Sequence, residues 1–524
     1  MKKYIHILSV VLSATFFSCD DLDVTPLGQL AGSNFPASDA DAIALTDGVY
    51  YPNVRISTAL GYVIDLTSDL EANAENENSG GYLLGVLNWE PTNSYVLTVW
   101  RNLYEIVTRA NDVVDKAGEA SDLRRRLQGE ARFLRAYAYF YLVQLWGEVP
   151  LVLHNVDGAT APREDIEKVY RQIVDDLLYA AEYLPAAAEY PATDRGRAAK
   201  GAACAYLSKV YLVWGQTSTL TEKAKERYAE SVRYADLVTG YSLEENFIDN
   251  WGNYNRNGKE SVFSVQHLQG QYAPGDGGNH LVHCSFINGF SNDPAKLPHV
   301  YATSNKWYDD FDDRDQRKRG TYIKEYRNPD EQHPDSVFVF DRVRYRKYVD
   351  TTNISNTATV RDINRTVIRY AEVLLLKAEA INERDGAPNA EAYDAINQVR
   401  RRAFRQFPVT AASAVADLPA GLNYEQFKER IQQERVFELT YEQNRWTDLV
   451  RWRIFVKTLK EAVSNGWIDA KYLKQNVQPY YYRFPIPKTQ RDIAPELLWQ
   501  NYGYDGSTVT ENPYRNYEPG WTDR

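Results

Sequence analysis

Three glutamates recur at helical spacing in the C-terminal third of the sequence: Glu434, Glu438 and Glu442. On a helix, residues four apart share one face, with Cβ atoms about 5–6 Å apart. That separation suits the two carboxylates of a retaining glycosidase. However, Arg435, Arg445 and Arg451 lie three residues from Glu438, Glu442 and Asp448, so the charges can also pair along the helices. We favour ion pairing over catalysis for this carboxylate ladder.

A second group of residues that could take part in chemistry, as metal ligands, is the segment His280-Leu281-Val282-His283-Cys284, with His267 upstream. Imidazole and thiolate are zinc ligands, but this spacing matches no strong zinc pattern. The acidic run 309–315 lacks the glycine and the terminal glutamate of a calcium loop. We therefore expect no metal and no cofactor, and a structural role for the acidic run.

Other catalytic and nucleic-acid signatures are missing from the sequence. It contains no G-x-S-x-G elbow, and the glycine-rich residues 275–278 lack the downstream Lys and Ser/Thr of a phosphate loop. The formal net charge of −11 argues against nucleic-acid binding, which needs a surplus of Lys and Arg. The sequence thus favours a binding protein over an enzyme.

The aromatic content is high, with 39 Tyr, 18 Phe and 11 Trp. The C–H faces of a glycan can pack on aromatic rings, while its hydroxyl groups pair with amides and carboxylates in a shallow, wet site. Two irregular segments, residues 72–98 and 266–310, combine aromatic and polar side chains. The candidate ligand-binding residues are Tyr82, Trp89, Asn93 and Tyr95 in the first segment and Tyr272, Asp276, His280 and Phe290 in the second.

Helices must hold these loops in place. Apolar residues at helical spacing predict about four helix pairs, in which small Ala residues alternate with large Tyr, Leu and Phe. The predicted pairs are 133–146 with 163–184, 198–214 with 222–239, 368–383 with 390–404, and 424–444 with 448–463. Because no fixed 34-residue period is present, this is an interrupted tetratricopeptide-like array of helix hairpins.

The predicted fold class is therefore mainly α, with an irregular, loop-rich ligand face and minor β structure. One strand is expected at 336–348, and the tail 465–524 should lack regular structure. The helical scaffold is assigned mainly to 100–260 and 366–465, and the ligand-face loops mainly to 50–98 and 265–345.

The N-terminus has the pattern of a lipoprotein signal. Lys2 and Lys3 precede an apolar stretch at 5–17, which is too short to span a bilayer and ends at Ser18-Cys19. An ordinary signal peptide with an incidental cysteine is the alternative. We predict a signal peptide at 1–18, a lipidated Cys19 with a flexible acidic tether over 19–38, and one domain over 39–524.

Five segments in order resemble the SusD/RagB family, the surface lipoproteins of nutrient-uptake systems in Bacteroidetes. Tyr502 stands where that family usually has proline. The segments are Arg109-Ala110-Asn111; 130–137 with 145–151 (EARFLRAY and LWGEVPL); 369–375 (RYAEVLL) with Ala378-Glu379-Ala380; 434–439 with 445–452 (ERVFEL and RWTDLVRW); and Pro485-Ile486-Pro487 with 500–504.

The resemblance implies a function and a partner. A member of this family would be a non-catalytic, cell-surface glycan-binding lipoprotein of the outer membrane, anchored through Cys19. It would deliver oligosaccharide to a SusC-like TonB-dependent barrel and act as the lid of that barrel. Two alternatives stay open: the same lid role for peptide cargo, as in RagB, or a glycoside hydrolase that uses the carboxylate ladder.

Overall fold

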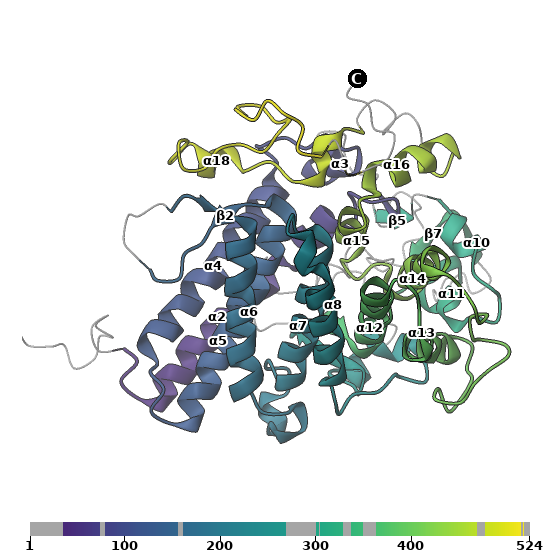
Figure 1. The fold of residues 1–524 in the computed structure, drawn as a ribbon, viewed down its shortest axis with the longest axis horizontal. Helices are drawn as coiled ribbons and strands as arrows, with labels where there is room; N and C mark the ends of the chain where they lie inside the picture. The colour runs from purple at the N-terminus through teal and green to yellow at the C-terminus, as the bar shows by residue number, and fades with distance from the viewer. Residues whose placement is uncertain are drawn as a thin grey trace, which may run out of the picture.

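Long helices packed side by side make up most of the molecule (Figure 1). The structure is a computed structural model and describes residues 35–73, 79–155, 161–268, 300–302, 304–327, 337–348, 363–468, 477–514 and 517. The long helices are α2 (Asp39–Ile64), α4 (Ser94–Lys116), α5 (Asp122–Trp146), α6 (Ile166–Tyr183), α7 (Lys200–Thr217), α8 (Ala224–Asp236), α12 (Tyr370–Asp385), α13 (Ala390–Ala403) and α14 (Tyr424–Leu439).

Successive helices pack as pairs: α2 with α4, α5 with α6, α7 with α8, and α12 with α13. The pairs also contact one another in chain order through α4–α5, α6–α7 and α8–α12, so they form a continuous row (Figure 1). The prediction of a mainly α, tetratricopeptide-like scaffold is confirmed, and three of its four helix pairs are found.

The fourth predicted pair is wrong in detail. Its first helix ends at Leu439, and the rest is divided between two short helices, α15 (Arg445–Arg451) and α16 (Phe455–Ser464). Positive φ angles at Tyr441 (67°), Gln443 (60°) and Arg453 (59°) interrupt the helices at these points. An α-helix requires negative φ at every residue, so the two breaks follow directly from this backbone.

The central helix α5 shows how the sequence specifies one of these elements. The Ser121 side chain caps its N-terminus by accepting from the Arg124 N–H, and Gly147 ends it with a φ of 77° that favours glycine. Arg135 on α5 donates two hydrogen bonds to the Asp176 carboxylate on α6, at 2.8 and 2.7 Å. The buried ion pair sets how this pair of helices packs.

The strands form four separate antiparallel ladders of two strands each among the described residues. They pair β1 (Glu71–Asn73) with β5 (Val300–Ala302), β2 (Val149–Pro150) with β3 (Arg163–Glu164), β4 (Ser261–Val265) with β8 (Arg365–Arg369), and β6 (Tyr322–Arg327) with β7 (Val337–Tyr345). The last strand confirms the one predicted at 336–348.

The C-terminal segment crosses one end of the helix row, at the top of Figure 1. No regular structure was predicted here, and the described residues of the segment form a 3-10 turn at Pro479–Tyr482 and the helix α18 (Lys488–Arg491). The segment is held by the buried Trp146, whose Nε1–H donates to the Pro485 carbonyl at 2.9 Å. Three further short helices are α3 (Gly80–Gly85), α10 (Lys306–Asp309) and α11 (Gln316–Thr321).

The assignment of residues 50–64 to a ligand-face loop is wrong, because they form the second half of α2. A capping box starts this helix: the Asp41 N–H donates to Ser38 Oγ, and the Ser38 N–H donates to the Asp41 carboxylate. From Pro52 to Ile64 nearly every side chain is buried, on all sides of the helix. Such a helix has no polar face, and so no amphipathic period for the sequence to display.

Candidate ligand-binding site

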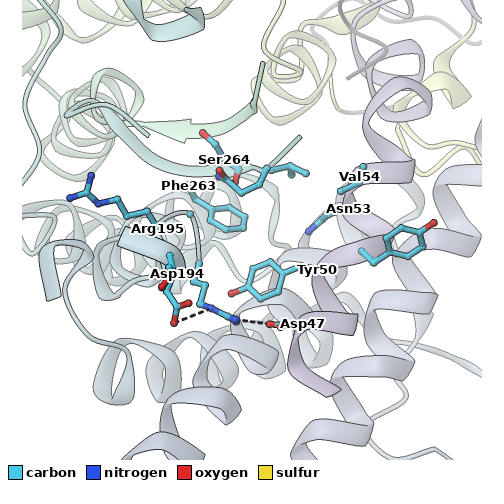
Figure 2. Close-up of a pocket in the computed structure, with 14 residues that line it drawn as sticks. Asp47, Tyr50, Asn53, Val54, Asp194, Arg195, Phe263 and Ser264 are labelled. Carbon is cyan, nitrogen blue, oxygen red and sulfur yellow. Dashed lines mark hydrogen bonds and ion pairs between the residues drawn. The ribbon is translucent and has the colours of Figure 1, made fainter. Parts of the chain in front are cut away.

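A pocket of about 360 Å³ lies between α2, the connection at 193–197 and the end of β4 (Figure 2). We call it the α2–β4 pocket. Tyr50 and Asn53 line it from α2 and Phe263 and Ser264 from β4; in Figure 2 the Phe263 ring points toward Tyr50, whereas the Ser264 side chain points to the other side of the strand. This volume is within the range of small-molecule sites, roughly 300–1,000 Å³.

Arg197 fixes one wall of the pocket. Its guanidinium group pairs with Asp47 at 2.7 Å, with Glu130 at 3.1 Å and with Asp194 at 3.5 Å. Burial raises the pKa of Glu130, while Arg197 and the Tyr50 hydroxyl oppose that rise. Because Arg197 is shared among three carboxylates, it holds α2, α5 and the 193–197 connection together.

A network of amides builds the wall on the side of β4. Gln266 exchanges hydrogen bonds with Asn257 at 2.9 and 3.0 Å, and it accepts from Asn364 Nδ2 at 2.9 Å. Gly196 lets the opposite loop approach this network, because a Cβ there would lie 2.4 Å from Gln266 Cδ. The wall is therefore preformed and polar.

Asn53 is the unusual residue of this pocket. Its side chain is 1% exposed, and among the described residues neither its amide nitrogen nor its amide oxygen has a hydrogen-bond partner. Figure 2 shows the amide pointing from α2 into the space in front of β4. A buried amide without a partner costs about 1–3 kcal/mol, so natural proteins seldom keep one. Both amide atoms are shielded from solvent, so the lining must move before a ligand that donates and accepts hydrogen bonds can satisfy them.

Two aromatic rings complete the pocket. Phe263 packs edge-to-face on Phe133 of α5, with ring centroids 4.9 Å apart. The Tyr50 hydroxyl donates to Glu130 at 2.8 Å and accepts from the Ala198 N–H at 3.0 Å. Burial raises the pKa of Tyr50 well above its usual value, so the phenol stays neutral. Rings beside amides suit a neutral, polar ligand with apolar faces.

The first group of sequence-predicted ligand residues lies elsewhere, around α3 and the start of α4. Asn93 caps α4 by accepting from the Tyr95 N–H, and its Nδ2 donates to the Gly80 carbonyl at 3.0 Å. The Tyr95 ring packs edge-to-face on Tyr62 of α2, at 4.7 Å. Tyr82 is partly exposed on α3. Tyr82 and Tyr95 keep some exposed surface, and their contact with a ligand stays a prediction.

Trp89 is placed in the core, where no ring face is open to a ligand. It is 3% exposed, stacks on Phe484 with centroids 4.2 Å apart, and donates from Nε1 to the Leu84 carbonyl at 3.1 Å. The C-terminal segment folds over this tryptophan and buries it. Asn93 is 6% exposed, and its side chain is already used in the hydrogen bonds that cap α4. We therefore leave both out of the proposed site.

Five other predicted residues lie outside the described part of the chain. They are Tyr272, Asp276, His280, Phe290 and the lipidation site Cys19. In sequence, Gln266, which lines the α2–β4 pocket, is six positions before Tyr272.

The carboxylate ladder is buried and neutralised. Glu438 accepts from Arg317, Arg369 and Arg402, and is 0% exposed. Burial alone would raise the pKa of Glu438, but these guanidinium groups hold it below its usual range. Glu434, at 1% exposed, pairs with Arg317 at 2.6 Å. A paired carboxylate without access to solvent cannot serve as a nucleophile or as an acid for an incoming glycan.

The prediction that the ladder pairs ionically holds, but the partners predicted for its glutamates were wrong, whereas the predicted Arg451–Asp448 pair forms at 2.9 Å. Arg435 bonds to Asp448 at 2.7 Å, and Arg445 bonds to Asp69 at 2.7 Å. The glutamates instead pair with cations that are distant in sequence. Among the described residues, no group of three or more His, Cys, Asp or Glu side chains is arranged to hold a metal ion.

Within the described residues, no helix is both long enough and apolar enough to cross a membrane.

Sequence reasoning missed the main residues of the α2–β4 pocket: Asp47, Tyr50, Asn53, Arg197 and Gln266. The capping-box pattern at Ser38 and Asp41 was the available signal for α2. A helix at this position would have brought the first three residues to one element. No local sequence pattern indicated that the 193–197 connection and β4 lie opposite α2 across the pocket.

Comparisons with known proteins agree with the fold. A family model described as "SusD family" matches residues 233–504, and one described as "Starch-binding associating with outer membrane" matches 58–212. SusD-like protein P2 of Formosa agariphila is 28% identical over 96% of this chain and 100% of its own length. The starch-binding protein SusD of Bacteroides thetaiotaomicron is 26% identical over 46% of each chain.

The architecture is also similar to that of solved structures. A SusD homologue from Bacteroides thetaiotaomicron has a TM-score of 0.77 at 26% identity, and the match covers 89% of this chain and 97% of that one. A SusD superfamily protein from Parabacteroides distasonis has a TM-score of 0.72 at 24% identity, covering 91% of this chain and 100% of that one. With one family model matching more than half of its length, the chain belongs to the SusD/RagB family.

Proposed function

We propose that this protein is a non-catalytic, cell-surface lipoprotein that captures oligosaccharides in the α2–β4 pocket. In this proposal the bound sugar is delivered to a SusC-like TonB-dependent barrel in the outer membrane, and the protein acts as the lid of that barrel. Residues 1–18 are the signal peptide, Cys19 carries the lipid, and residues 19–38 tether the domain at 39–524.

The observation that carries the proposal is the unpaired amide of Asn53 in the wall of the pocket. A sugar hydroxyl can donate to its oxygen and accept from its nitrogen at the same time. Tyr50 offers partly exposed ring surface beside it, and the buried Phe263 ring forms the apolar floor. Together these groups match the alternating C–H faces and hydroxyl edges of a pyranose.

One relative and one family model make saccharide the preferred cargo over peptide. One is the starch-binding protein SusD, and the other is the matched model whose description names starch binding and the outer membrane. The burial of the carboxylate ladder speaks against the hydrolase alternative, because Glu434 and Glu438 are at most 1% exposed.

The test is retention of the purified mature chain in native gels that contain soluble starch, laminarin, xyloglucan or pectin. At least one polysaccharide should slow the chain relative to a non-binding protein, without shortening of the polymer. Binding to a mixed peptide library, with no retention by any polysaccharide, would instead favour the peptide alternative. Mass spectrometry of the native protein should find Cys19 acylated as its first residue.

A further inference from the structure

A second pocket, of about 450 Å³, lies between α10, α14 and α16. We call it the Trp307–Trp467 pocket, after the two partly exposed tryptophans in its lining. It shares no lining residue with the α2–β4 pocket. The sequence reading singled out neither tryptophan.

The end of α16 places Trp467. Gly466 adopts a φ of 69°, which reverses the chain after the helix, and the Trp467 N–H then donates back to the Ala462 carbonyl at 2.8 Å. Ile468, two residues after the glycine, is buried at 6% exposure and anchors the turn. The indole is thus held by a defined helix terminus.

Trp307 is held from two sides. Asn305, before α10, donates to the Asp341 carbonyl and accepts from the Val343 N–H, which ties α10 to β7. Beneath the indole, Arg445 makes two hydrogen bonds to Asp69, at 2.7 and 2.8 Å, and its guanidinium carbon lies 5.6 Å from the ring centroid of Trp307. This floor is rigid and already paired.

Lys306 joins the two rings. Its ammonium nitrogen lies 4.4 Å from the ring centroid of Trp307 and 4.7 Å from that of Trp467, and it pairs with Asp310. Both indole rings therefore face the Lys306 ammonium group, and its cation–π contact with each ring fixes the distance between the two rings.

The rest of the lining indicates the class of ligand. Carboxylates and cationic side chains are present in equal number, and Gln432 and Gln433 of α14 add amide donors and acceptors. A balanced lining gives no net attraction for a polyanion or a polycation. Two partly exposed aromatic rings among mixed donors and acceptors suit a neutral molecule with apolar faces and hydroxyl edges, which would displace the Lys306 ammonium group from the ring faces.

We propose that the Trp307–Trp467 pocket is a second saccharide-binding site, separate from the α2–β4 pocket. This inference rests on the proposed function, because it assigns the same class of ligand. Two sites on one chain would bind a polysaccharide with an avidity that neither site reaches alone. Short oligosaccharides would occupy the two sites independently.

The test is titration calorimetry of the mature chain with maltoheptaose, laminariheptaose and xyloglucan heptasaccharide. With the heptasaccharide of the retained polysaccharide, wild type should bind two molecules per chain. Trp307→Ala and Trp467→Ala should each bind one, with at least tenfold weaker retention in the polysaccharide gel. Tyr254→Ala, which removes a 70% exposed aromatic outside both pockets, is the matched control and should still bind two. Unchanged unfolding midpoints establish that each variant is folded.

The outcomes separate this inference from the proposed function. One site in wild type, with binding unaffected by either tryptophan substitution, overturns the second site and leaves the proposed function standing. Loss of all binding in the tryptophan variants, with full binding in Asn53→Leu, supports this site and contradicts the α2–β4 pocket. No heat and no retention with any saccharide contradicts the proposed function and the second site together.

Discussion

At the scale of single residues, Asn53 is the clearest sign that part of this structure is arranged for a ligand. Most buried polar groups of the described chain are satisfied, even those in crowded charge networks such as Arg369, which bonds to Glu260, Glu438 and Glu442. Leaving both atoms of one buried amide unpaired costs stability, and the fold gains nothing from it.

We therefore predict that Asn53→Leu stabilises the free protein, by about 1 kcal/mol, because an apolar side chain of similar size removes the unpaired amide. Urea unfolding monitored by circular dichroism measures the change. The matched control is Asn111→Leu, since the buried Asn111 amide donates to the Val152 carbonyl and accepts from Arg135. The control should lose stability, and a loss of similar size in Asn53→Leu would contradict the prediction.

In the carboxylate ladder, by contrast, we expect a substitution to destabilise the protein. Glu438→Gln removes the charge that three buried arginines share, and should destabilise the protein by about 3–5 kcal/mol. Glu429→Gln, an exposed position on the same helix α14, should change stability by less than about 0.5 kcal/mol. Equal denaturation midpoints for the two variants would show that the ion pairs of Glu438 contribute little to the stability of the protein.

A pH dependence follows from the carboxyl groups beside β1. Burial, and then Glu442, raise the pKa of Asp65 to about 8, against the opposing effects of the Gln443 N–H and Lys347. A raised folded-state pKa means that the folded protein binds more protons than the unfolded chain between about pH 4 and pH 8. This contribution to stability is therefore present at the acidic end of that range and is lost as the pH rises.

Asp65→Asn should remove the part of the pH dependence of the unfolding free energy that comes from this carboxyl group, which is at most about 1.4 kcal/mol per pH unit. Unfolding free energies of wild type and variant, measured at pH 5.5, 6.5, 7.5 and 8.5, give the comparison. As the pH rises toward 8.5, the variant should become increasingly more stable than wild type. A stability difference that is the same at every pH would contradict the assignment of the extra proton to Asp65.

At the scale of elements, the sequence predicted the helices that carry a clear boundary signal or an apolar period. The end of α5 at Gly147 and the start of α13 after Asn389 are both marked by capping residues. The second half of α2 was missed because it is buried on all sides and contains Pro52. The breaks after α14 were missed because they occur at Tyr441, Gln443 and Arg453, which are not glycine.

Gly147 and Gly386 allow a test of how helix ends fix the scaffold. Both end helices with positive φ, but Gly386 lies in the left-handed region (φ 70°, ψ 12°), whereas Gly147 has a ψ of −119°. A Cβ on Gly147 would also lie 3.1 Å from Arg483 Nε, while one on Gly386 would meet nothing within 4 Å. Gly147→Ala should therefore cost about 2–3 kcal/mol and Gly386→Ala about 1 kcal/mol in thermal or urea unfolding. The reverse order would contradict this account of the α5 terminus.

At the scale of the whole molecule, family and fold could be predicted because the recurrent segments belong to the scaffold. Trp146, for example, ties α5 to the C-terminal segment, and both lie within segments that carried the resemblance. The candidate ligand site could not be predicted in the same way. The α2–β4 pocket is assembled from three elements that are distant in sequence, and the packing among them decides which side chains face it.

Packing among distant segments also explains why the sequence pointed to Trp89 and not to Trp307 or Trp467. Trp89 looked available because it follows no helical period, yet the C-terminal segment covers it. Trp307 and Trp467, separated by 160 positions in the chain, meet over the ammonium group of Lys306. Proximity of this kind is a property of the folded chain alone.

The most direct test of the central claim is the dissociation constant of the retained saccharide, measured by titration calorimetry for wild type and Asn53→Leu under identical conditions. The account predicts that the variant remains folded and at least as stable as wild type, yet loses the site at the α2–β4 pocket or binds there at least tenfold more weakly. Equal affinity and equal stoichiometry in the two proteins would contradict it.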